Sequence, residues 1–253
     1  MPDKAIEILD LVKIFEDDAR GEVRAVDGVS LEVCTGEIVG LLGVNGAGKT
    51  TTLRILATVL QPTSGTARIM GHDVLEDPGS VRRSIGYYSS STALYPRLTA
   101  RETLEFFARV NGCPASGVRQ RVEGLIAEMG MGEFAGVRVE KLSQGMKQKV
   151  SIGRTIVHEP GVLIFDEPTA GLDVLNAHDM LRQISGFRST GHAVIYSTHI
   201  MTEAERICDR IAIIHAGRIH ACGTPDSLMR ETGSSNLEDA FVRIVKPGEA
   251  LLR

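Results

Sequence analysis

The stretch GVNGAGKT, residues 43–50, decides the fold, because it matches the phosphate-binding pattern G-x-x-x-x-G-K-[ST] at every fixed position. An apolar run, IVGLL at 38–42, leads into it, and TTLRILA at 51–57 is expected to form a helix. Strand, glycine loop and helix in this order are the context that the pattern requires. A glycine-rich turn that merely contains a lysine would lack these flanks.

The chemistry of this loop follows from its residue types. Glycines let the backbone wrap a polyphosphate closely, and the first turn of the helix adds partial positive charge. Lys49 is expected to reach the β- and γ-phosphates, and the Thr50 hydroxyl to bind Mg²⁺. The residues expected to contact a nucleotide here are Gly43, Val44, Asn45, Gly46, Ala47, Gly48, Lys49, Thr50 and Thr51.

Composition narrows the class of protein. With 253 residues, 43% of them apolar, the chain has room for one large α/β domain or two small ones. A net charge of −4 and only 4% aromatic residues argue against a nucleic-acid surface. Four scattered cysteines without a C-x-x-C pair suggest reduced thiols in the cytosol. The first residues are too charged for a signal peptide, and no apolar run is long enough to cross a bilayer, so a membrane role requires a partner.

Hydrophobic patterns predict an α/β fold. Ile6, Ile8 and Leu11 fit one strand and residues 29–33 another, with a charged turn at 16–22 between them. Non-alternating apolar runs at 162–165, 193–196 and 211–214 are typical of a parallel sheet buried on both faces.

Helical periodicity is expected between about residues 89 and 160, at positions such as Leu104 and Leu125, with a break at 112–114. We therefore predict a P-loop NTPase core with a mostly parallel sheet and an N-terminal antiparallel β subdomain, formed by residues 1–88 and 161–230. The remaining parts are a helical subdomain at 89–160 and a tail at 231–253, whose residues 236–243 form a short amphipathic helix.

Acidic residues follow one of the apolar strands. In FDEP, residues 165–168, Asp166 lies where open α/β folds bind ligands and suits a Mg²⁺ shell, directly or through water. Glu167 suits the role of a base or of a group that positions the attacking water. His199 follows the strand end YST at 196–198 and is able to bond a phosphate oxygen or that water. An acidic turn or a loop histidine is ordinary by itself, and the phosphate loop upstream favours the catalytic interpretation.

Together these motifs resemble the ATPase subunits of ATP-binding-cassette (ABC) transporters. LSQGM at 142–146 is similar to the family's L-S-G-G-Q signature, with Gln144 and Met146 at its variable places. DEPT at 166–169 resembles the second acidic motif, AGLD at 170–173 the D-loop, and STH at 197–199 the switch histidine. GRI at 217–219 and GTP at 223–225 are similar to the closing segment. The resemblance runs in consistent order from about residue 5 to 228.

The resemblance implies a mechanism. ATP and Mg²⁺ are the expected cofactors, Glu167 and His199 the expected catalytic residues, and Phe15 the aromatic that stacks on adenine. Two copies of the chain are expected to meet head to tail, so that Ser143 and Gly145 of one cover the γ-phosphate bound by the other. A separate multispanning permease would place the protein in the cytoplasm, on the inner face of the cell membrane, with no nucleic acid as a partner.

One position departs from the family pattern. Ser90 stands where the family usually has a glutamine that touches Mg²⁺ and the attacking water, and its hydroxyl is a shorter candidate metal ligand. The following LYPRLTARE, residues 94–102, resembles the NatA-like branch of drug and ion exporters. That branch is similar in lacking the glutamine, which favours export of an ion or small molecule. We expect the permease to contact the helical insertion near residues 94–102.

Two alternatives stay open. The first is a soluble ABC ATPase of translation or DNA repair, although such relatives usually carry two cassettes or a long coiled coil. Here only about seventy residues separate Tyr88 from Pro160, without sustained heptads. The second is a nucleotide-gated module with little hydrolysis, which Glu167 and His199 oppose and Ser90 favours. A GTPase is the weakest interpretation, because the chain has no N-K-x-D motif.

Overall fold

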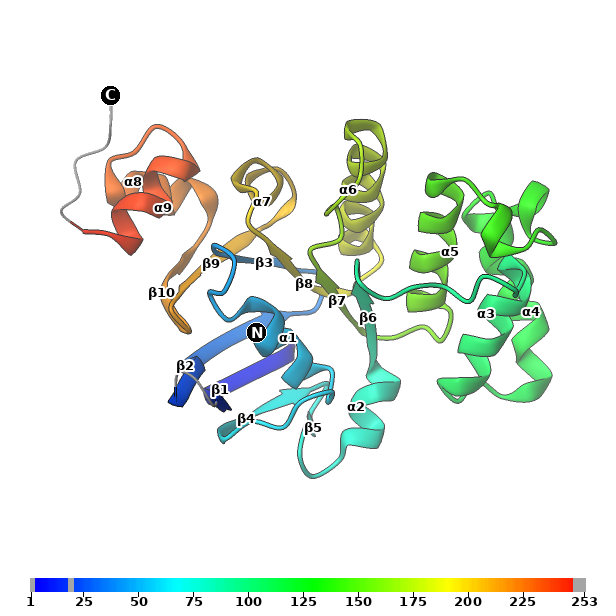
Figure 1. The fold of residues 1–253 in the computed structure, drawn as a ribbon, viewed down its shortest axis with the longest axis horizontal. Coiled ribbons are helices and arrows are strands. Elements are labelled where there is room, and N and C mark those ends of the chain that lie inside the picture. The colour runs from blue at the N-terminus through cyan, green and yellow to red at the C-terminus, as the bar shows by residue number, and fades with distance from the viewer. Residues whose placement is uncertain (1–2, 18–20, 248–253) are drawn as a thin grey trace.

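The computed structural model describes residues 3–17 and 21–247 (Figure 1). Its central sheet has the order β10-β9-β3-β8-β7-β6, in which only β9 and β10 pair antiparallel. The mostly parallel sheet of the sequence prediction is thereby confirmed. The strands are β3 (Ile38–Leu42), β6 (Ile85–Ser89), β7 (Val162–Asp166), β8 (Ala193–Thr198), β9 (Arg210–His215) and β10 (Arg218–Gly223).

Both faces of this sheet are buried from β9 to β6, which explains why these strands do not alternate, whereas the edge strand β10 alternates between exposed and half-buried residues. Alternate residues of each strand enter two separate cores: in β7, Val162 and Ile164 face one, and Leu163 and Phe165 the other. The first core also contains apolar residues of helix α1 and of the N-terminal strands, and the second contains those of the helices on the opposite face. The edge at which β3, β7 and β8 end is thus held between two packed layers.

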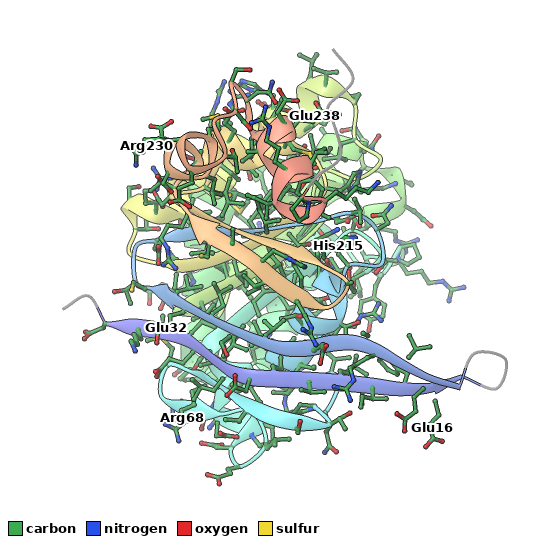
Figure 2. All side chains as sticks on the ribbon, turned by 90° about the vertical axis from the view of Figure 1, so that its left-hand side faces the viewer. Glu16, Glu32, Arg68, His215, Arg230 and Glu238 are labelled. Carbon is green, nitrogen blue, oxygen red and sulfur yellow. The ribbon has the colours of Figure 1, made fainter. Side chains whose placement is uncertain are left out.

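A second, antiparallel sheet forms the N-terminal β subdomain and has the order β2-β1-β4-β5. Its strands are β1 (Lys4–Asp17), β2 (Gly21–Cys34), β4 (Ser64–Ile69) and β5 (His72–Asp73). Figure 2 shows it beneath the β9–β10 hairpin, with Glu16 near the end of the long β1–β2 hairpin. The strands run further than the predicted turn at 16–22 allows, and residues 18–20 of that turn lie outside the described residues.

Helices between the sheets and at their edges complete the fold. The first half of the chain supplies α1 (Lys49–Leu56), α2 (Pro78–Ser84), α3 (Ala100–Val110) and α4 (Ala115–Glu128). The 3₁₀ turns η1 (Gly132–Phe134) and η2 (Val139–Lys141) lead into α5 (Gln144–Ile156). The expected helices and the break at 112–114 are confirmed, and Leu104 and Leu125 are fully buried.

The second half of the chain carries α6 (Val174–Ser189), α7 (Met201–Ile207), α8 (Pro225–Thr232) and α9 (Leu237–Val245). The predicted helix at 236–243 is confirmed as α9, whereas α8 was not predicted. Both lie at one end of the molecule and α3 and α4 at the other, with the central sheet between them (Figure 1). None of the helices in the described ranges combines the length and apolar character needed to span a membrane.

Candidate nucleotide site

The loop that joins β3 to α1 approaches neighbouring backbone too closely for any residue but glycine at two positions. A Cβ on Gly43 would stand 2.3 Å from the carbonyl oxygen of Ile214. Gly48 has φ +105°, and a Cβ there would stand 2.4 Å from the carbonyl oxygen of Ala25. The loop thereby folds over the start of α1 and leaves a pocket of about 240 Å³, lined by residues 45–51, Ala25 and Glu167.

Lys49 is the first residue of α1, and its side chain is only 4% exposed. The ammonium donates to the carbonyl oxygens of Gly43 at 2.7 Å and of Val44 at 3.2 Å. It also lies 3.3 Å from Oε1 of Glu167. A buried point charge is therefore fixed at the mouth of the loop, where an incoming phosphate would find it.

Asp166, the last residue of β7, collects three hydroxyl donors. Thr50 Oγ1 donates to its Oδ1 at 3.0 Å, and Ser197 Oγ to the same oxygen at 2.8 Å. Tyr87 donates to Oδ2 at 3.3 Å, and burial together with the Asp166 charge raises the pKa of Tyr87. Hydroxyl and carboxylate oxygens are the ligands that Mg²⁺ prefers, so Thr50 and Asp166 fit this metal.

Ser197 and Tyr87 were not among the expected site residues. Ser197 stands opposite Asp166 in the β7–β8 register, and Tyr87 lies on β6, on the other side of β7. Ser197 lies in the segment STH, but that motif was read for its histidine, and Tyr87 belongs to none of the motifs. Aligning the ends of the parallel strands would have pointed to Ser197, because these ends meet at one edge of the sheet.

Glu167 follows β7 directly and has a left-handed backbone, with φ +47°. Its N–H donates to Ser197 Oγ at 3.1 Å, which helps to hold this unfavourable conformation. Its Oε1 lies 3.3 Å from Nδ1 of His199 and equally far from the Lys49 ammonium. The carboxylate thus stands between a cation at the phosphate loop and an imidazole, an arrangement suited to orienting and deprotonating a water.

A second network behind His199 was also missed by sequence reasoning. The carboxylate of Glu203, on α7, is buried and accepts from Tyr196 at 2.8 Å and from Thr198 at 2.9 Å. Thr198 Oγ1 in turn accepts from the backbone N–H of Ile200 at 3.0 Å. Burial and the neighbouring carboxylate raise the pKa of Tyr196, which keeps its hydroxyl a donor. These bonds fix the backbone on both sides of His199.

Other expected site residues lie outside this pocket. Ser143 is the N-cap of α5, where its side chain accepts from the N–H of Met146, and a Cβ on Gly145 would stand 3.0 Å from Asn176 Oδ1. Ser90 is exposed and follows β6. Phe15 is 37% exposed near the end of the β1–β2 hairpin, with the Lys13 ammonium 5.1 Å from its ring centre.

In Figure 1, α1 and α5 lie apart, with strands of the central sheet between them. The structure thus brings together Lys49, Thr50, Asp166, Glu167 and His199 within one chain. It does not bring Ser143 and Gly145 to them.

Comparison with known proteins identifies the family of this chain. The family model for the ABC transporter matches residues 26–170, which include the phosphate loop, the segment LSQGM and Asp166 with Glu167. The chain belongs to the ABC transporter family. ATP binding and ATP hydrolysis are the activities of this family, and the α/β core with its antiparallel β subdomain is its fold.

The sequences of its relatives match this ABC protein over nearly its whole length. It is 37% identical to the ABC transporter ATP-binding protein NatA of Bacillus subtilis (strain 168), over 94% of this chain and 96% of the relative. It is also 37% identical to the Nod factor export ATP-binding protein I of Paraburkholderia xenovorans (strain LB400), over 100% of this chain and 80% of the relative. A solved dimeric structure of a bacterial ABC transporter cassette superimposes with a TM-score of 0.75 at 26% identity, covering 87% of this chain and 98% of the other.

Proposed function

We propose that this chain is the ATP-hydrolysing subunit of an ABC exporter, which couples hydrolysis to the export of an ion or small molecule through a separate membrane permease. One observation carries the catalytic part: Glu167 lies 3.3 Å from both the Lys49 ammonium and His199 Nδ1. A carboxylate between the phosphate-binding cation and an imidazole is placed to act on a water that attacks the terminal phosphate.

In this proposal the phosphate loop binds the triphosphate of ATP. The backbone N–H groups of residues 43–48 and the start of α1 stabilise its negative charge, and Lys49 pairs with the β- and γ-phosphates. Phe15 stacks on the adenine. Thr50 and Asp166 would hold Mg²⁺, which would supply positive charge to stabilise the phosphate oxygens. Ser90 is a further candidate ligand that would reach the metal through water.

The chain's own residues then carry the proton and position the water. Glu167 takes a proton from the water, and the strained backbone at this residue directs its carboxylate toward the loop. His199 bonds Glu167 through Nδ1, which leaves Nε2 for a γ-phosphate oxygen or the water. Catalysis is therefore positioning together with charge stabilisation.

A second copy of the chain completes the site in this proposal. Ser143 and Gly145 at the start of α5 lie away from the phosphate loop of their own chain (Figure 1). The start of a helix with small residues suits close approach to a phosphate. The likeness to a dimeric ABC cassette supports a head-to-tail pair in which ATP lies between the two chains. We retain the division into a core of residues 1–88 and 161–230, a helical subdomain at 89–160 and a tail at 231–253.

The permease is proposed to contact the helical subdomain from the cytoplasmic side. Tyr95 and Phe106 are 53% and 42% exposed, and their rings meet edge to face at 5.7 Å beside the expected contact region at 94–102. Arg154 of α5 ties this region to the core of the molecule, because its guanidinium donates to the carbonyl oxygens of Thr92 at 3.0 Å and Ala93 at 3.2 Å. Exposed aromatic residues are common at protein interfaces.

Glu167→Gln tests the proposed function. The amide keeps the size of the side chain but cannot accept the proton, so we expect ATP binding to persist and turnover to fall roughly 10²–10⁴-fold. The unhydrolysed nucleotide should trap a dimer, visible by size-exclusion chromatography. Glu76→Gln, on an exposed loop, removes the same charge away from the site and should leave turnover unchanged. Turnover of the Glu167 variant within a few-fold of wild type would refute the assignment.

A further inference from the structure

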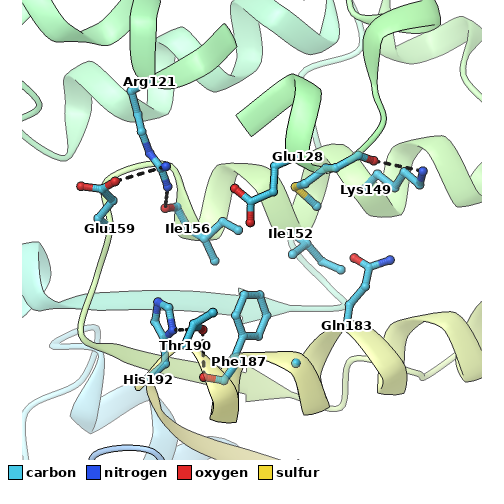
Figure 3. Close-up of a pocket in the computed structure, with 12 residues that line it drawn as sticks. Arg121, Glu128, Lys149, Ile152, Ile156, Glu159, Gln183, Phe187, Thr190 and His192 are labelled. Atoms are coloured by element: carbon cyan, nitrogen blue, oxygen red, sulfur yellow. Dashed lines mark hydrogen bonds and ion pairs between the residues drawn. The ribbon is translucent and has the colours of Figure 1, made fainter. Parts of the chain in front are cut away.

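A pocket of about 540 Å³ lies between the helical subdomain and α6 (Figure 3), and no residue of the phosphate loop lines it. Its walls come from the end of α4, from the C-terminal half of α5 and from the C-terminal half of α6 with the turn that follows. The volume is in the range of small-molecule sites. Five ionisable residues line it: Arg121, Glu128, Lys149, Glu159 and His192.

The cations of this pocket are already engaged. Arg121 donates to the carbonyl oxygens of Ile156 and Val157, which end α5, and pairs with Glu159 at 3.2 Å. The Lys149 ammonium donates to the carbonyl oxygen of Met129 at 3.1 Å, at the end of α4. Both charges thus stabilise helix C-termini. Burial lowers the pKa of His192, which keeps this side chain neutral near pH 7.

Two acceptors remain without a partner among the described residues. Oε1 of Gln183, on α6, is buried and accepts no hydrogen bond. Glu128 is exposed to solvent and has no hydrogen bond or ion pair within the described ranges, and Figure 3 shows its carboxylate pointing into the pocket. The buried, unpaired oxygen of Gln183 costs free energy, so a ligand that donates to it gains affinity, whereas Glu128 contributes a negative charge that attracts a cation.

The remaining wall is apolar and includes an aromatic ring. Met129, Ile152 and Ile156 line the α4 and α5 side. Phe187 of α6 points into the pocket in Figure 3, opposite these residues, and one face of its ring stacks on Phe165 in the core, with centres 6.1 Å apart. The ring is therefore held in place, and it offers a surface to an aromatic ligand or to a cation.

We propose that this pocket binds a small aromatic amine. Its ammonium donates to Glu128 and Gln183, and its ring packs between Phe187 and the aliphatic side chains of α5. An amine is favoured over a carboxylate because the free groups of the pocket are acceptors and its two permanent cations are bonded to backbone carbonyls.

Occupancy of the pocket also changes the rate of ATP hydrolysis in this proposal, a part that depends on the proposed function. The N-terminal ends of the same helices are also connected: Gln148 of α5 donates to the carbonyl oxygen of Asn176 on α6, and Gln144 to that of Gly171 just before α6, both at 3.4 Å. A ligand that fixes the separation of the C-terminal halves of α5 and α6 therefore acts on the segment LSQGM, where α5 begins. Because protein interiors are densely packed, a change in the separation of α5 and α6 at one end is transmitted along both helices to the other end.

Tryptamine is a direct probe, because the chain contains no tryptophan and indole fluorescence reports the probe alone. We expect saturable binding to the full-length protein. Tryptophol, which replaces the amine with a hydroxyl, should bind about tenfold or more weakly, since a charge-assisted bond is lost. Glu128→Gln should weaken tryptamine binding to a similar extent. Gln183→Leu should weaken it less, and this variant is expected to fold because it removes an unpaired buried acceptor.

Three controls separate the possible results. Glu133→Gln makes the same charge change in the helical subdomain outside the pocket, and should leave tryptamine affinity unchanged. An excess of a non-hydrolysable ATP analogue should not displace tryptamine, which excludes stacking of the indole at Phe15. ATP turnover should change with half-effect at the tryptamine Kd.

Equal binding of tryptamine and tryptophol, or no effect of Glu128→Gln, would overturn the proposed site. Binding at saturation without any change in turnover would overturn its coupling to hydrolysis. Absence of turnover before tryptamine is added would instead count against the proposed ATPase, because the fluorescence measurement does not depend on hydrolysis.

Discussion

At the end of β7, the backbone of the proposed catalytic residue Glu167 is strained. Glu167 has φ +47°, a conformation that costs about 1–2 kcal/mol for a residue with a Cβ. The motifs around Lys49, Asp166 and Glu167 were predictable because each is a short local pattern. The contact of Ser197 with Asp166 and the bonds of Glu203 were not, because they depend on strand register and on the packing of α7, which no local pattern encodes.

Lys49→Ala should abolish most ATP affinity, because Lys49 is the point charge of the phosphate loop. The change also leaves the Gly43 and Val44 carbonyl oxygens without this donor, so a stability loss of about 1–3 kcal/mol is expected beside it. Calorimetric titration with ATP and urea denaturation measure the two effects separately. Lys141→Ala, on an exposed turn, is the matched control and should change neither. Unchanged ATP affinity in Lys49→Ala would remove this residue from the site.

His158 should make the stability of the protein depend on pH. Burial lowers the pKa of His158, its Nε2 bonds the Ile85 carbonyl oxygen at 2.8 Å, and its buried Nδ1 has no partner in the described structure. The folded state therefore resists protonation, while the unfolded chain takes up a proton below about pH 6.5. Stability should consequently fall as the pH decreases through this value.

Urea denaturation between about pH 5 and 7.5 checks this prediction. In His158→Gln the decrease in unfolding free energy over this range should be smaller than in wild type. His220→Gln, at an exposed position of β10, should retain the wild-type slope. Identical slopes for wild type and His158→Gln would show that this histidine does not contribute.

Elements with a local signal were predicted, but irregularities produced by neighbouring elements were not. The apolar runs in β7 and β8 contain no alternating polar residues, because both faces of the sheet are covered there. Such runs can be recognised in the sequence as buried strands. In β1, by contrast, Ile8 and Leu11 are both buried although three positions separate them. A bulge with Asp10 at φ +46° restores the inward direction, and only pairing with β2 and β4 produces it. α8 is short and was missed, although Thr224 caps it and Pro225 begins it.

Glu203→Gln tests whether α7 holds the end of β8. The amide replaces a buried carboxylate that accepts from two hydroxyls, so we expect a loss of about 1–3 kcal/mol in unfolding free energy. Because these bonds fix the backbone beside His199, kcat should fall while the KM for ATP changes little. Glu205→Gln, at an exposed position of the same helix, should change neither stability nor kcat. A variant as stable and as active as wild type would show that the hydrogen bonds of Glu203 contribute neither to stability nor to catalysis.

At the scale of the whole molecule, the phosphate loop and the start of α5 lie apart on the same chain (Figure 1). The layered core and its β subdomain could be predicted because their patterns are strong and the motifs appear in family order. The proposed pairing of two chains does not follow from burial within one chain. A test of this pairing requires a substitution that disrupts the interface between the two chains and leaves the fold of each chain intact.

Ser143→Asp provides such a change. Aspartate replaces serine well as an N-cap, so α5 should remain intact. Its negative charge would face the γ-phosphate bound by the second copy and should prevent ATP-dependent dimerisation in the Glu167→Gln background. Ser143→Asn, which caps without charge, should still dimerise. Size-exclusion chromatography with ATP checks both, and a dimer of undiminished yield in Ser143→Asp would argue against the head-to-tail arrangement.

The two bonds from Arg154 to the backbone at Thr92 and Ala93 have a mechanical consequence. α5 is 13 residues long, so it forms a rod of roughly 20 Å with Ser143 at its start and Arg154 in its last turn. If the permease displaces the exposed aromatic pair beside this loop, these bonds would carry the displacement to one end of the rod, and the opposite end would move with it. Under the proposed function, contact at one surface would thus reach another through a tilt of α5, with every helix and strand still folded.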